Sequence, residues 1–458
     1  MTIDLNRRKF TIGLGLTGIA FGGLAACMDN AKGPRFAGSA DQPGYGPLVE
    51  DPNGMIDLPA GFSYRILSSH GDRMDDGHVV PDNADGMGCF RLDDRRIALV
   101  RNHELKVKDM AGGPAGRAGL KGAAAYDALS GGEALPGGTT TIILDAATLK
   151  IEAQYLSLAG TIRNCAGGIT PWGSWLSCEE DVTRAGQDGV SWDHGWVFEV
   201  PAAHRGMANP APLTAMGRFN HEAVCVDPAT GIVYMTEDRD ESLFYRFIPN
   251  ERGELAKGGK LQALALTDGP GDTRNWKSKA FDRNVWTNAR WVDLDGVDSP
   301  EDDLRFRGEA SGAAVFARGE GIWFGKGELY FCCTSGGAAG LGQIMRYRPS
   351  PQEGQPTEAS APGTLQLFYE STDKSQFNYG DNLTIAPHGD LIVCEDQYTA
   401  IVDNYLRGVT PDGTAYPLAK LRLQTEWAGA CFSPDGRTLF VNLYSPGRTV
   451  AIQGPWNA

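Results

Sequence analysis

The sequence predicts an all-β fold, namely a six-bladed β-propeller with loop and short helical decorations. Glycine occupies 60 of the 458 positions, about twice its usual share of ~7%, and runs free of Gly and Pro that could form long helices are scarce. Short stretches of alternating polarity are separated by turns rich in Pro, Gly and Asp. From about residue 83 onward one hairpin pattern recurs six times, and radial repetition of hairpins is typical of propellers.

Each repeat is a hairpin that begins at a polar residue and ends at a polar or acidic one. The six hairpins begin at Asp85, Cys165, Glu222, Glu320, Asp381 and Glu426. Carboxylates at hairpin ends are Glu104, Glu179, Glu180, Glu237 and Glu395, whereas the fourth hairpin ends in Cys332-Cys333-Thr334. A hairpin returns to the end at which it began, and the innermost strands of a propeller line its channel. Both sets are therefore predicted at one mouth of that channel.

So many carboxylates at one mouth indicate a multi-metal site. Ionised together, they would repel one another by several kcal/mol unless cations neutralise them. Carboxylate oxygens are hard donors that suit Ca²⁺, whereas the thiolate of Cys165 suits a transition metal, so a mixed cluster is implied. The alternative is that the acidic residues are solvated and that Cys165 is a small buried hydrophobe.

The first 27 residues are predicted to be an export signal. Arg7 and Arg8 lie in a short basic segment before a weakly apolar, Gly-rich stretch, as in twin-arginine signals. Leu24-Ala25-Ala26-Cys27 is similar to a lipobox, in which Cys27 would carry lipid; the alternative is an ordinary signal-peptidase site beside a chance cysteine. Residues 28–55 are expected to be a flexible lead-in, and residues 56–458 a single β-propeller catalytic domain.

This signal predicts a periplasmic or exported protein. The twin-arginine translocation machinery is then a partner, and contact with a membrane is expected only through the lipid anchor at Cys27. A monomer is the default, because the chain shows no repeated apolar surface helices.

Several longer motifs occur in order along the chain. They are Arg101-Asn102-His103-Glu104, Asn164-Cys165-Ala166-Gly167-Gly168, Trp172-Gly173-Ser174-Trp175-Leu176-Ser177-Cys178-Glu179-Glu180, Gly217-Arg218-Phe219-Asn220-His221-Glu222, Phe316-Ala317-Arg318-Gly319-Glu320-Gly321, Gly380-Asp381-Asn382-Leu383, Cys394-Glu395-Asp396 and Glu426-Trp427-Ala428-Gly429. Together they resemble the motifs of the PhoX-type alkaline phosphatases over most of the chain.

The resemblance implies a periplasmic or secreted phosphomonoesterase with two oxo-bridged ferric ions (Fe³⁺) and calcium ions (Ca²⁺) beside them. It implies that Cys165 ligates iron and that Glu222 and Glu320 are also metal ligands. The calcium ligands are then expected among Glu104, Glu179, Glu180, Glu237, Asp381 and Glu395. His103 and His221, each between Asn and Glu, are expected to orient neighbouring ligands by hydrogen bonds.

Two candidate catalytic residues follow from the same resemblance. Arg318, two residues before Glu320, matches the phosphate-contacting arginine of the family, and Asn164 precedes the iron-binding cysteine. The alternative for Arg318 is a surface ion pair with Glu320 or Glu309. No GxSxG, HExxH or GxxxxGK[ST] motif occurs in the sequence, so hydrolysis by a side-chain nucleophile is disfavoured.

The charge of the chain limits its partners. Lys and Arg total 42 and Asp and Glu total 57, which gives a net charge of −15, and no basic block follows the N-terminal segment. Nucleic acid is therefore not an expected partner, since binding to its phosphates needs clustered cations. Small phosphate esters would need a local cationic field, which bound metals and Arg318 would supply.

Two other functions stay open at this point. A calcium-dependent propeller lactonase or esterase would use the same channel mouth, but it needs fewer carboxylates and no thiolate. A non-enzymatic, metal-stabilised propeller would bind partners on its blade surfaces.

Overall fold

The computed structural model describes residues 43–114, 120, 124–396 and 402–456. The described residues all belong to one compact unit. The predicted twin-arginine signal, Cys27 and the lead-in as far as residue 42 lie outside the described residues. Among the described residues, the helices are all too short or too polar to cross a membrane.

Antiparallel strands in six consecutive groups make up most of the described chain. The first two groups are β4 (Ala84–Arg91), β5 (Arg96–His103), β6 (Gly137–Asp145) and β7 (Ile151–Thr161), then β8 (Asn164–Ile169), β9 (Ser174–Glu179) and β10 (Val197–Pro201). The next two are β11 (His221–Val226), β12 (Val233–Glu237), β13 (Tyr245–Pro249) and β14 (Gly259–Leu266), then β16 (Gly319–Gly325), β17 (Glu328–Cys333), β18 (Gln343–Arg348) and β19 (Thr364–Glu370). The last two are β20 (Gly380–Ile385), β21 (Leu391–Glu395), β22 (Asn404–Val409) and β23 (Ala415–Leu421), then β24 (Trp427–Phe432), β25 (Thr438–Leu443) and β26 (Arg448–Gln453).

The remaining elements are short or join these groups. The other strands are β1 (Leu48–Val49), β2 (Ile56–Pro59), β3 (Ser63–Ser69) and β15 (Trp286–Asp293). Helical structure in the described chain consists of α1 (Leu304–Ala310) and 3₁₀ turns at Val107–Gly112, Thr214–Met216, Leu255–Lys257 and Glu358–Ser360. The predicted short helical decorations are thus present.

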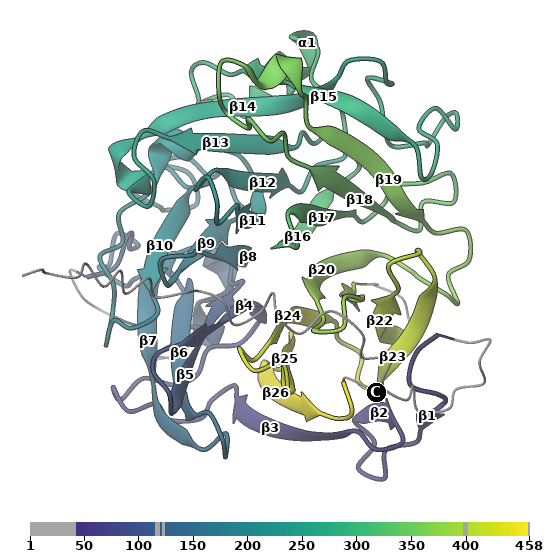
Figure 1. The fold of residues 1–458 in the computed structure, drawn as a ribbon. Helices are drawn as coiled ribbons and strands as arrows, with labels where there is room; N and C mark the ends of the chain where they lie inside the picture. Colours follow the sequence, from purple (N-terminus) through teal and green to yellow (C-terminus); the bar gives the residue numbers. More distant parts are fainter. Residues whose placement is uncertain (1–42, 115–119, 121–123, 397–401, 457–458) are drawn as a thin grey trace, which may run out of the picture. The chain divides into compact units, whose positions relative to one another are not determined.

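The first strands of the six groups form a closed ring around the centre of the molecule (Figure 1). In order around the ring they are β4, β8, β11, β16, β20 and β24, and β24 contacts β4 again. The sheets number five among the described residues, because β15 pairs with both β14 and β19 and so joins two groups. Apolar side chains pack between neighbouring groups, as Leu99 and Phe440 do in one buried cluster. The predicted all-β propeller is confirmed, and each group is one blade.

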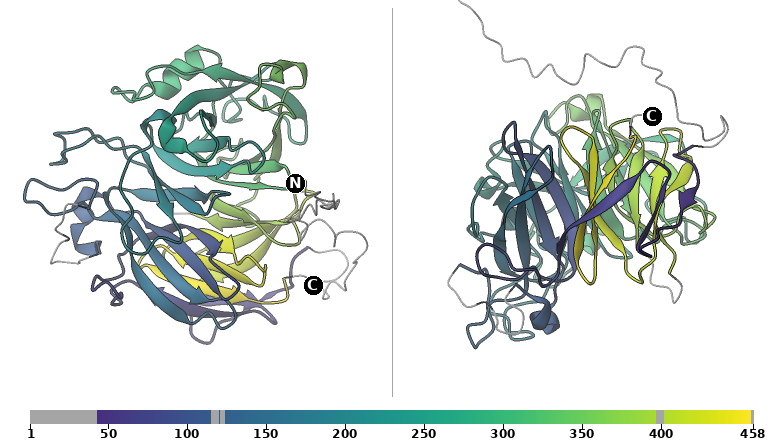
Figure 2. Two further views of the ribbon diagram at one scale, coloured as in Figure 1. Left: turned by 60° about the vertical axis from the view of Figure 1, so that its left-hand side comes forward. Right: turned by 90° about the horizontal axis from the view of Figure 1, so that it is seen from below.

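The ring is closed by strands from both ends of the described chain. β3 pairs antiparallel with β26, so that Ile66 lies opposite Val450, and it completes the four-stranded sheet of the last blade (Figure 2). β2 pairs with β23 in the blade before it. Pairing an early strand with a late one stabilises the closed ring, because opening it would break a full ladder of backbone hydrogen bonds.

A β-bulge recurs in the innermost strand of every blade. Each pairing of a first and second strand shifts its register across two residues near the start of the first strand. The first residues of the six bulges are Asp85, Cys165, Glu222, Glu320, Asp381 and Gly429. The sequence alignment of the sixth repeat is therefore wrong by three residues, since Gly429 and not Glu426 is the structural counterpart of Asp85. A bulge bends its strand and re-aims side chains, so this feature sets the geometry of the channel mouth.

Candidate metal centre

Five side chains from the bulges meet at the mouth of the channel, and all are buried. Their exposed fractions are 3% for Asp85, 8% for Cys165, 0% for Glu222, 4% for Glu320 and 9% for Asp381. Sγ of Cys165 lies 3.3 Å from Oε1 of Glu222 and 3.6 Å from Oδ2 of Asp85. One thiol is thus held between carboxylates from the two neighbouring blades.

A second set of carboxylates follows the second strand of four blades. These residues are Glu104, Glu180, Asp238 and Asp396, and each donates its backbone N–H to the residue before the bulged strand of its own blade. Glu180 hydrogen-bonds with Asp238, and Glu426 with Asp396. Three groups of donor atoms each lie within 4.8 Å of one another: Asp85, Glu104 and Cys165; Cys165, Glu180 and Glu222; Glu222, Glu320 and Asp381.

Glu179, Glu237 and Glu395 are not brought to this cluster. Each is the last residue of the second strand of its blade, and its carboxylate is bound within that blade. The side-chain partners are His194 at 2.7 Å for Glu179, Tyr245 at 2.7 Å for Glu237 and Arg407 at 2.7 Å for Glu395. Since successive side chains of a strand point to opposite faces, Glu180 faces the cluster when Glu179 does not.

Arg318 lies at the cluster and is about 29% exposed. Its Nε donates to Oδ1 of Asp238 at 2.7 Å, and its Nη2 donates to Oε1 of Glu320 at 2.9 Å. The ion pair with Glu320 that the alternative interpretation expects is present, and the shortest contact is with Asp238. The guanidinium is therefore both oriented by two carboxylates and open to solvent.

Arg163 occupies the corresponding position of another blade. Its Nε donates to Oε1 of Glu104 at 2.7 Å, and its Nη1 lies 2.7 Å from Oε1 of Glu180. Its side chain is about 24% exposed. Arg163 lies directly before a bulged strand, as Arg318 does, but no motif in the sequence indicates it as a site residue.

Asn164 points away from the cluster, although Cys165 beside it points inward. Its Nδ2 donates to Oγ of Ser177 at 2.9 Å, and its Oδ1 accepts from Oγ1 of Thr161 at 2.6 Å. Ser177 lies in β9 of the same blade and Thr161 at the end of β7 in the blade before it, and all three residues are fully buried. The structure thus places this residue as a support for the start of β8 and not beside Arg318.

The two motif histidines are buried and do not hydrogen-bond the carboxylates that follow them. His103 contacts the backbone oxygen of Asp82 at 2.9 Å and Oγ1 of Thr140 at 2.9 Å. His221 contacts the backbone oxygen of Gly217 at 2.8 Å. Burial lowers the pKa of His221 to about 3 and lowers that of His103 as well, so both are neutral. The expected hydrogen bonds from these histidines to neighbouring ligands are therefore wrong, and both side chains brace the backbone instead.

The sequence matches the family described as alkaline phosphatase PhoX over residues 43–145 and 139–447. This chain belongs to the PhoX alkaline phosphatase family. The predicted family and enzyme class, a metal-dependent phosphate monoesterase, are thereby confirmed. A comparison with curated proteins found no match.

Several solved structures are similar to this PhoX-family protein, and the first named here shares its fold. Pseudomonas fluorescens PhoX in complex with vanadate, a transition state analogue, has 18% identity and a TM-score of 0.64 over 88% of this chain and 96% of that one. A gluconolactonase from Xanthomonas campestris has 14% identity and a TM-score of 0.40 over 90% and 99% of the two chains. A periplasmic gluconolactonase from Pseudomonas aeruginosa has 12% identity and a TM-score of 0.36 over 85% and 94%.

The charges of the PhoX-family cluster fit bound cations. Burial, and then the neighbouring carboxylates, raise the pKa values of Asp85, Glu222 and Glu320 well above the usual range. Burial and Asp396 raise that of Asp381 to about 8. In the described chain, Oδ1 of Asp85 and Oε2 of Glu222 are buried without a hydrogen-bond partner. Buried carboxylate oxygens with free lone pairs, beside a thiol, are a donor set for metal ions.

Several residues of the PhoX-family centre were not predicted from the sequence. Asp238, Asp396 and Arg163 lie at repeat positions equivalent to Glu180 and Arg318, so an alignment on the bulges would have found them. The hairpin pattern predicts Asp85 and Glu426 at the channel mouth, but it does not indicate either of them as a metal ligand. The structure puts Asp85 in a donor group and bonds Glu426 to Asp396.

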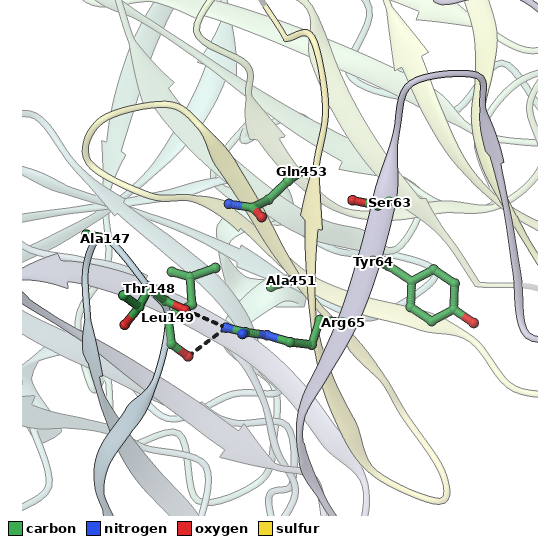
Figure 3. A pocket seen from close by; sticks show the side chains of 8 residues that line it. All are labelled: Ser63, Tyr64, Arg65, Ala147, Thr148, Leu149, Ala451 and Gln453. Atoms are coloured by element: carbon green, nitrogen blue, oxygen red, sulfur yellow. Dashed lines mark hydrogen bonds between the residues drawn. The ribbon is translucent and has the colours of Figure 1, made fainter.

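A surface pocket of the PhoX-family protein lies away from the centre, between β3, β26 and the turn before β7 (Figure 3). Its cation, Arg65, donates from Nη2 to the backbone oxygens of Thr148 at 3.1 Å and Leu149 at 2.8 Å. The guanidinium is thereby used to hold the turn against β3. This pocket has no carboxylate in its lining and does not compete with the cluster as a metal site.

Proposed function

We propose that this protein releases inorganic phosphate from small phosphate monoesters at a mixed iron and calcium centre in the channel mouth. The observation that carries the proposal is the position of Cys165, whose thiol lies 3.3 Å from Glu222 and 3.6 Å from Asp85 inside a buried carboxylate cluster. A single soft donor among hard oxygens selects a transition metal at one position and leaves all-oxygen positions beside it.

The three donor groups suggest how the metals are divided. The two groups that share Cys165 suit iron, and they would use Asp85, Glu104, Glu180 and Glu222 as oxygen donors. The group of Glu222, Glu320 and Asp381 is all-oxygen, and such donors suit Ca²⁺ or Fe³⁺. Glu222 belongs to two groups and would connect them. Bound metal ions supply Lewis acidity, which polarises phosphoryl oxygens and activates a nucleophile near neutral pH.

Arg318 and Arg163 would bind the phosphoryl oxygens. A phosphate dianion approaching a chain of net charge −15 needs local cations, and these two guanidinium groups are oriented at the edge of the cluster and partly exposed. The planar fork of an arginine matches two phosphoryl oxygens, and its hydrogen bonds strengthen as charge accumulates on them. Asp238 and Glu320 hold Arg318 in place, which reduces the rotamer entropy lost on binding.

Export by the twin-arginine pathway agrees with this centre. The described cysteines are all free thiols, and a chain exported after folding can acquire its metals beforehand. We propose that the protein is a periplasmic or exported monomer. We further propose that Cys27 becomes its mature N-terminal residue and carries lipid. Mass spectrometry of that residue distinguishes lipidated from plainly cleaved protein.

The decisive experiment pairs metal content with turnover. Elemental mass spectrometry of the purified mature protein is combined with hydrolysis of an aryl phosphate monoester before and after calcium chelation, and both are repeated on Cys165→Ala. We expect about two iron atoms per chain, as the family resemblance implies, calcium-dependent activity, and loss of iron and turnover in Cys165→Ala. Cys89→Ala, which removes a thiol on another innermost strand, β4, outside the three donor groups, is the matched control. Calcium without iron and no phosphate release would overturn the proposal, and lactone hydrolysis would then be measured.

A further inference from the structure

Three side chains of second strands donate hydrogen bonds to the bulge of the next blade. Nδ2 of Asn102 donates to the backbone oxygens of Cys165 at 3.1 Å and Ala166 at 2.6 Å. Oγ1 of Thr236 donates to the backbone oxygen of Glu320 at 2.5 Å. Nδ2 of Asn442 donates to the backbone oxygen of Asp85 at 2.5 Å. Cys165, Glu320 and Asp85 all send their side chains into the metal centre, whereas the shorter of the two Asn102 bonds goes to Ala166 beside Cys165.

The three donors share a place in the fold. Asn102, Thr236 and Asn442 lie near the ends of β5, β12 and β25, the second strands of their blades, and all are at most 1% exposed. By register Asn102 and Thr236 are equivalent, since each precedes the partner of the residue directly before the bulge. Asn442 lies one position later, because it is itself that partner and pairs with Ala428. The contact therefore recurs at one register position in two blades and at the next position in a third.

Further hydrogen bonds lock the two asparagine side chains. Oδ1 of Asn102 accepts from Nε1 of Trp175 and from Oγ of Ser177, both at 2.9 Å. Oδ1 of Asn442 accepts from Oγ1 of Thr449 at 2.7 Å. With the oxygen held in this way, the amide nitrogen of each side chain is aimed at the neighbouring bulge.

The bulge explains why such a donor is needed. A bulge leaves a backbone group without a partner in its own ladder, and a buried carbonyl must find a donor elsewhere. Neighbouring bulges also approach closely, because a Cβ on Gly86 would lie 2.5 Å from Cα of Ala166, and one on Gly321 would lie 2.5 Å from Cα of Asn382. The backbone of a ligand residue is thus held by the blade before it.

We propose that Asn102, Thr236 and Asn442 are positioning residues that fix the ligands Cys165, Glu320 and Asp85 through the backbone of their bulges. The inference rests on the proposed function, because it assumes that these three side chains bind metal. Metal affinity depends on how closely the ligands are held to the required geometry, and residues that orient ligands typically contribute about 10- to 100-fold to affinity or activity.

Thr236 offers the cleanest test, because Val has its shape without the hydroxyl and Ser keeps the hydroxyl without the methyl. A chelator is added to three metal-loaded proteins, namely wild type, Thr236→Val and Thr236→Ser. Elemental mass spectrometry then measures how much iron and calcium each protein retains over time. Thr438→Val, the same change at the opposite end of a second strand and with Thr438 also buried, is the control. Thermal unfolding of the metal-free proteins reports the cost to the fold separately.

We expect Thr236→Val to lose metal about 10- to 100-fold faster than wild type, with Thr236→Ser and Thr438→Val close to wild type. Retention of metal by Thr236→Val at the wild-type rate overturns the inference. If Thr236→Val does not fold, Thr236→Ala, which leaves room for a water molecule, takes its place under the same criterion. Wild-type protein that holds no metal would defeat the proposed function, whereas metal-retaining variants would defeat this inference alone.

Discussion

Arg163 and Arg318 occupy the same position in two different blades. Each directly precedes a bulged strand, each has a left-handed backbone with φ of 51°, and each bridges two carboxylates of the cluster. A left-handed conformation costs a non-glycine residue on the order of 1–3 kcal/mol, so it persists where the surrounding structure enforces it. Here it aims both guanidinium groups at the channel mouth from positions before β8 and β16.

This relationship predicts that the two arginines act together on substrate. Arg318→Lys and Arg163→Lys keep the charge but lose the planar fork, and we expect each to lower kcat/KM about 10- to 100-fold, since a hydrogen bond to a charged group contributes about 1.5–3 kcal/mol. Steady-state hydrolysis of an aryl phosphate measures the effect. Arg96 forms an exposed ion pair with Asp93 at the end of β5 that lies away from the cluster, so Arg96→Lys should leave kcat/KM unchanged. Wild-type kinetics in a folded Arg163→Lys would remove Arg163 from the site.

The neighbours Glu179 and Glu180 should respond differently to the same change. Glu180→Gln removes a donor from the group with Cys165 and Glu222, so we expect less bound metal and at least about a 10-fold loss of turnover. Glu179→Gln removes a charge bonded to His194 and should lower the free energy of unfolding by about 1–3 kcal/mol with metal content unchanged. Urea unfolding measures the stability of both variants, and elemental analysis measures their metal content. Metal loss in Glu179→Gln with none in Glu180→Gln would reverse our assignment.

Removal of metal should destabilise the fold, because the cluster carboxylates are buried close together. A ligand that binds only the folded state at 100 times its Kd stabilises that state by about 2.7 kcal/mol. We therefore expect chelation to lower the midpoint of thermal unfolding by several degrees and re-addition of iron and calcium to restore it. Chelator already saturated with metal serves as the control. An unchanged midpoint, after metal loss has been verified, would show that the carboxylates are neutralised by protons instead.

His194 should make stability depend on pH in the alkaline range. Burial alone would lower the pKa of His194, but the carboxylates of Glu179 at 2.7 Å and Asp127 at 3.3 Å outweigh it and raise the pKa to about 9. A raised folded-state pKa means that the stabilisation is complete below the unfolded value of 6.5 and is lost as pH rises through about 9. We expect a loss on the order of 3 kcal/mol in wild type between these limits.

Urea unfolding at pH 6 and pH 10 checks this expectation, with His194→Gln as the comparison. The variant should be less stable than wild type at pH 6 and should show a smaller decrease toward pH 10. His204→Gln, an exposed histidine, should follow the wild-type curve. An equal decrease in wild type and His194→Gln would assign the pH dependence to other groups.

Much of the architecture could be predicted because its signals are local. Turn residues and alternating polarity mark each hairpin, and six hairpins suffice to indicate a propeller, as the ring from β4 to β24 confirms. The sixth repeat was misaligned because Glu426 has the charge expected at that position, whereas the structural counterpart is Gly429, which carries no donor. Charge was therefore a poorer guide to register than the bulge, and a bulge has no clear signature in a single sequence.

The sequence by itself determined which donors are available, namely many carboxylates and the thiol of Cys165, and it predicted that they gather at one end of the ring. Only the tertiary structure decided which of them face one another. Glu179 and Glu180 are chemically alike and adjacent, yet the alternation of the strand sends one to His194 and the other to the cluster. Likewise, Asn164 hydrogen-bonds Ser177 and Thr161, whereas its neighbour Cys165 enters the cluster. The reason is physical: the direction of each side chain depends on where the bulge resets the pleat, and neighbouring blades hold that bulge in place through contacts between residues far apart in the chain.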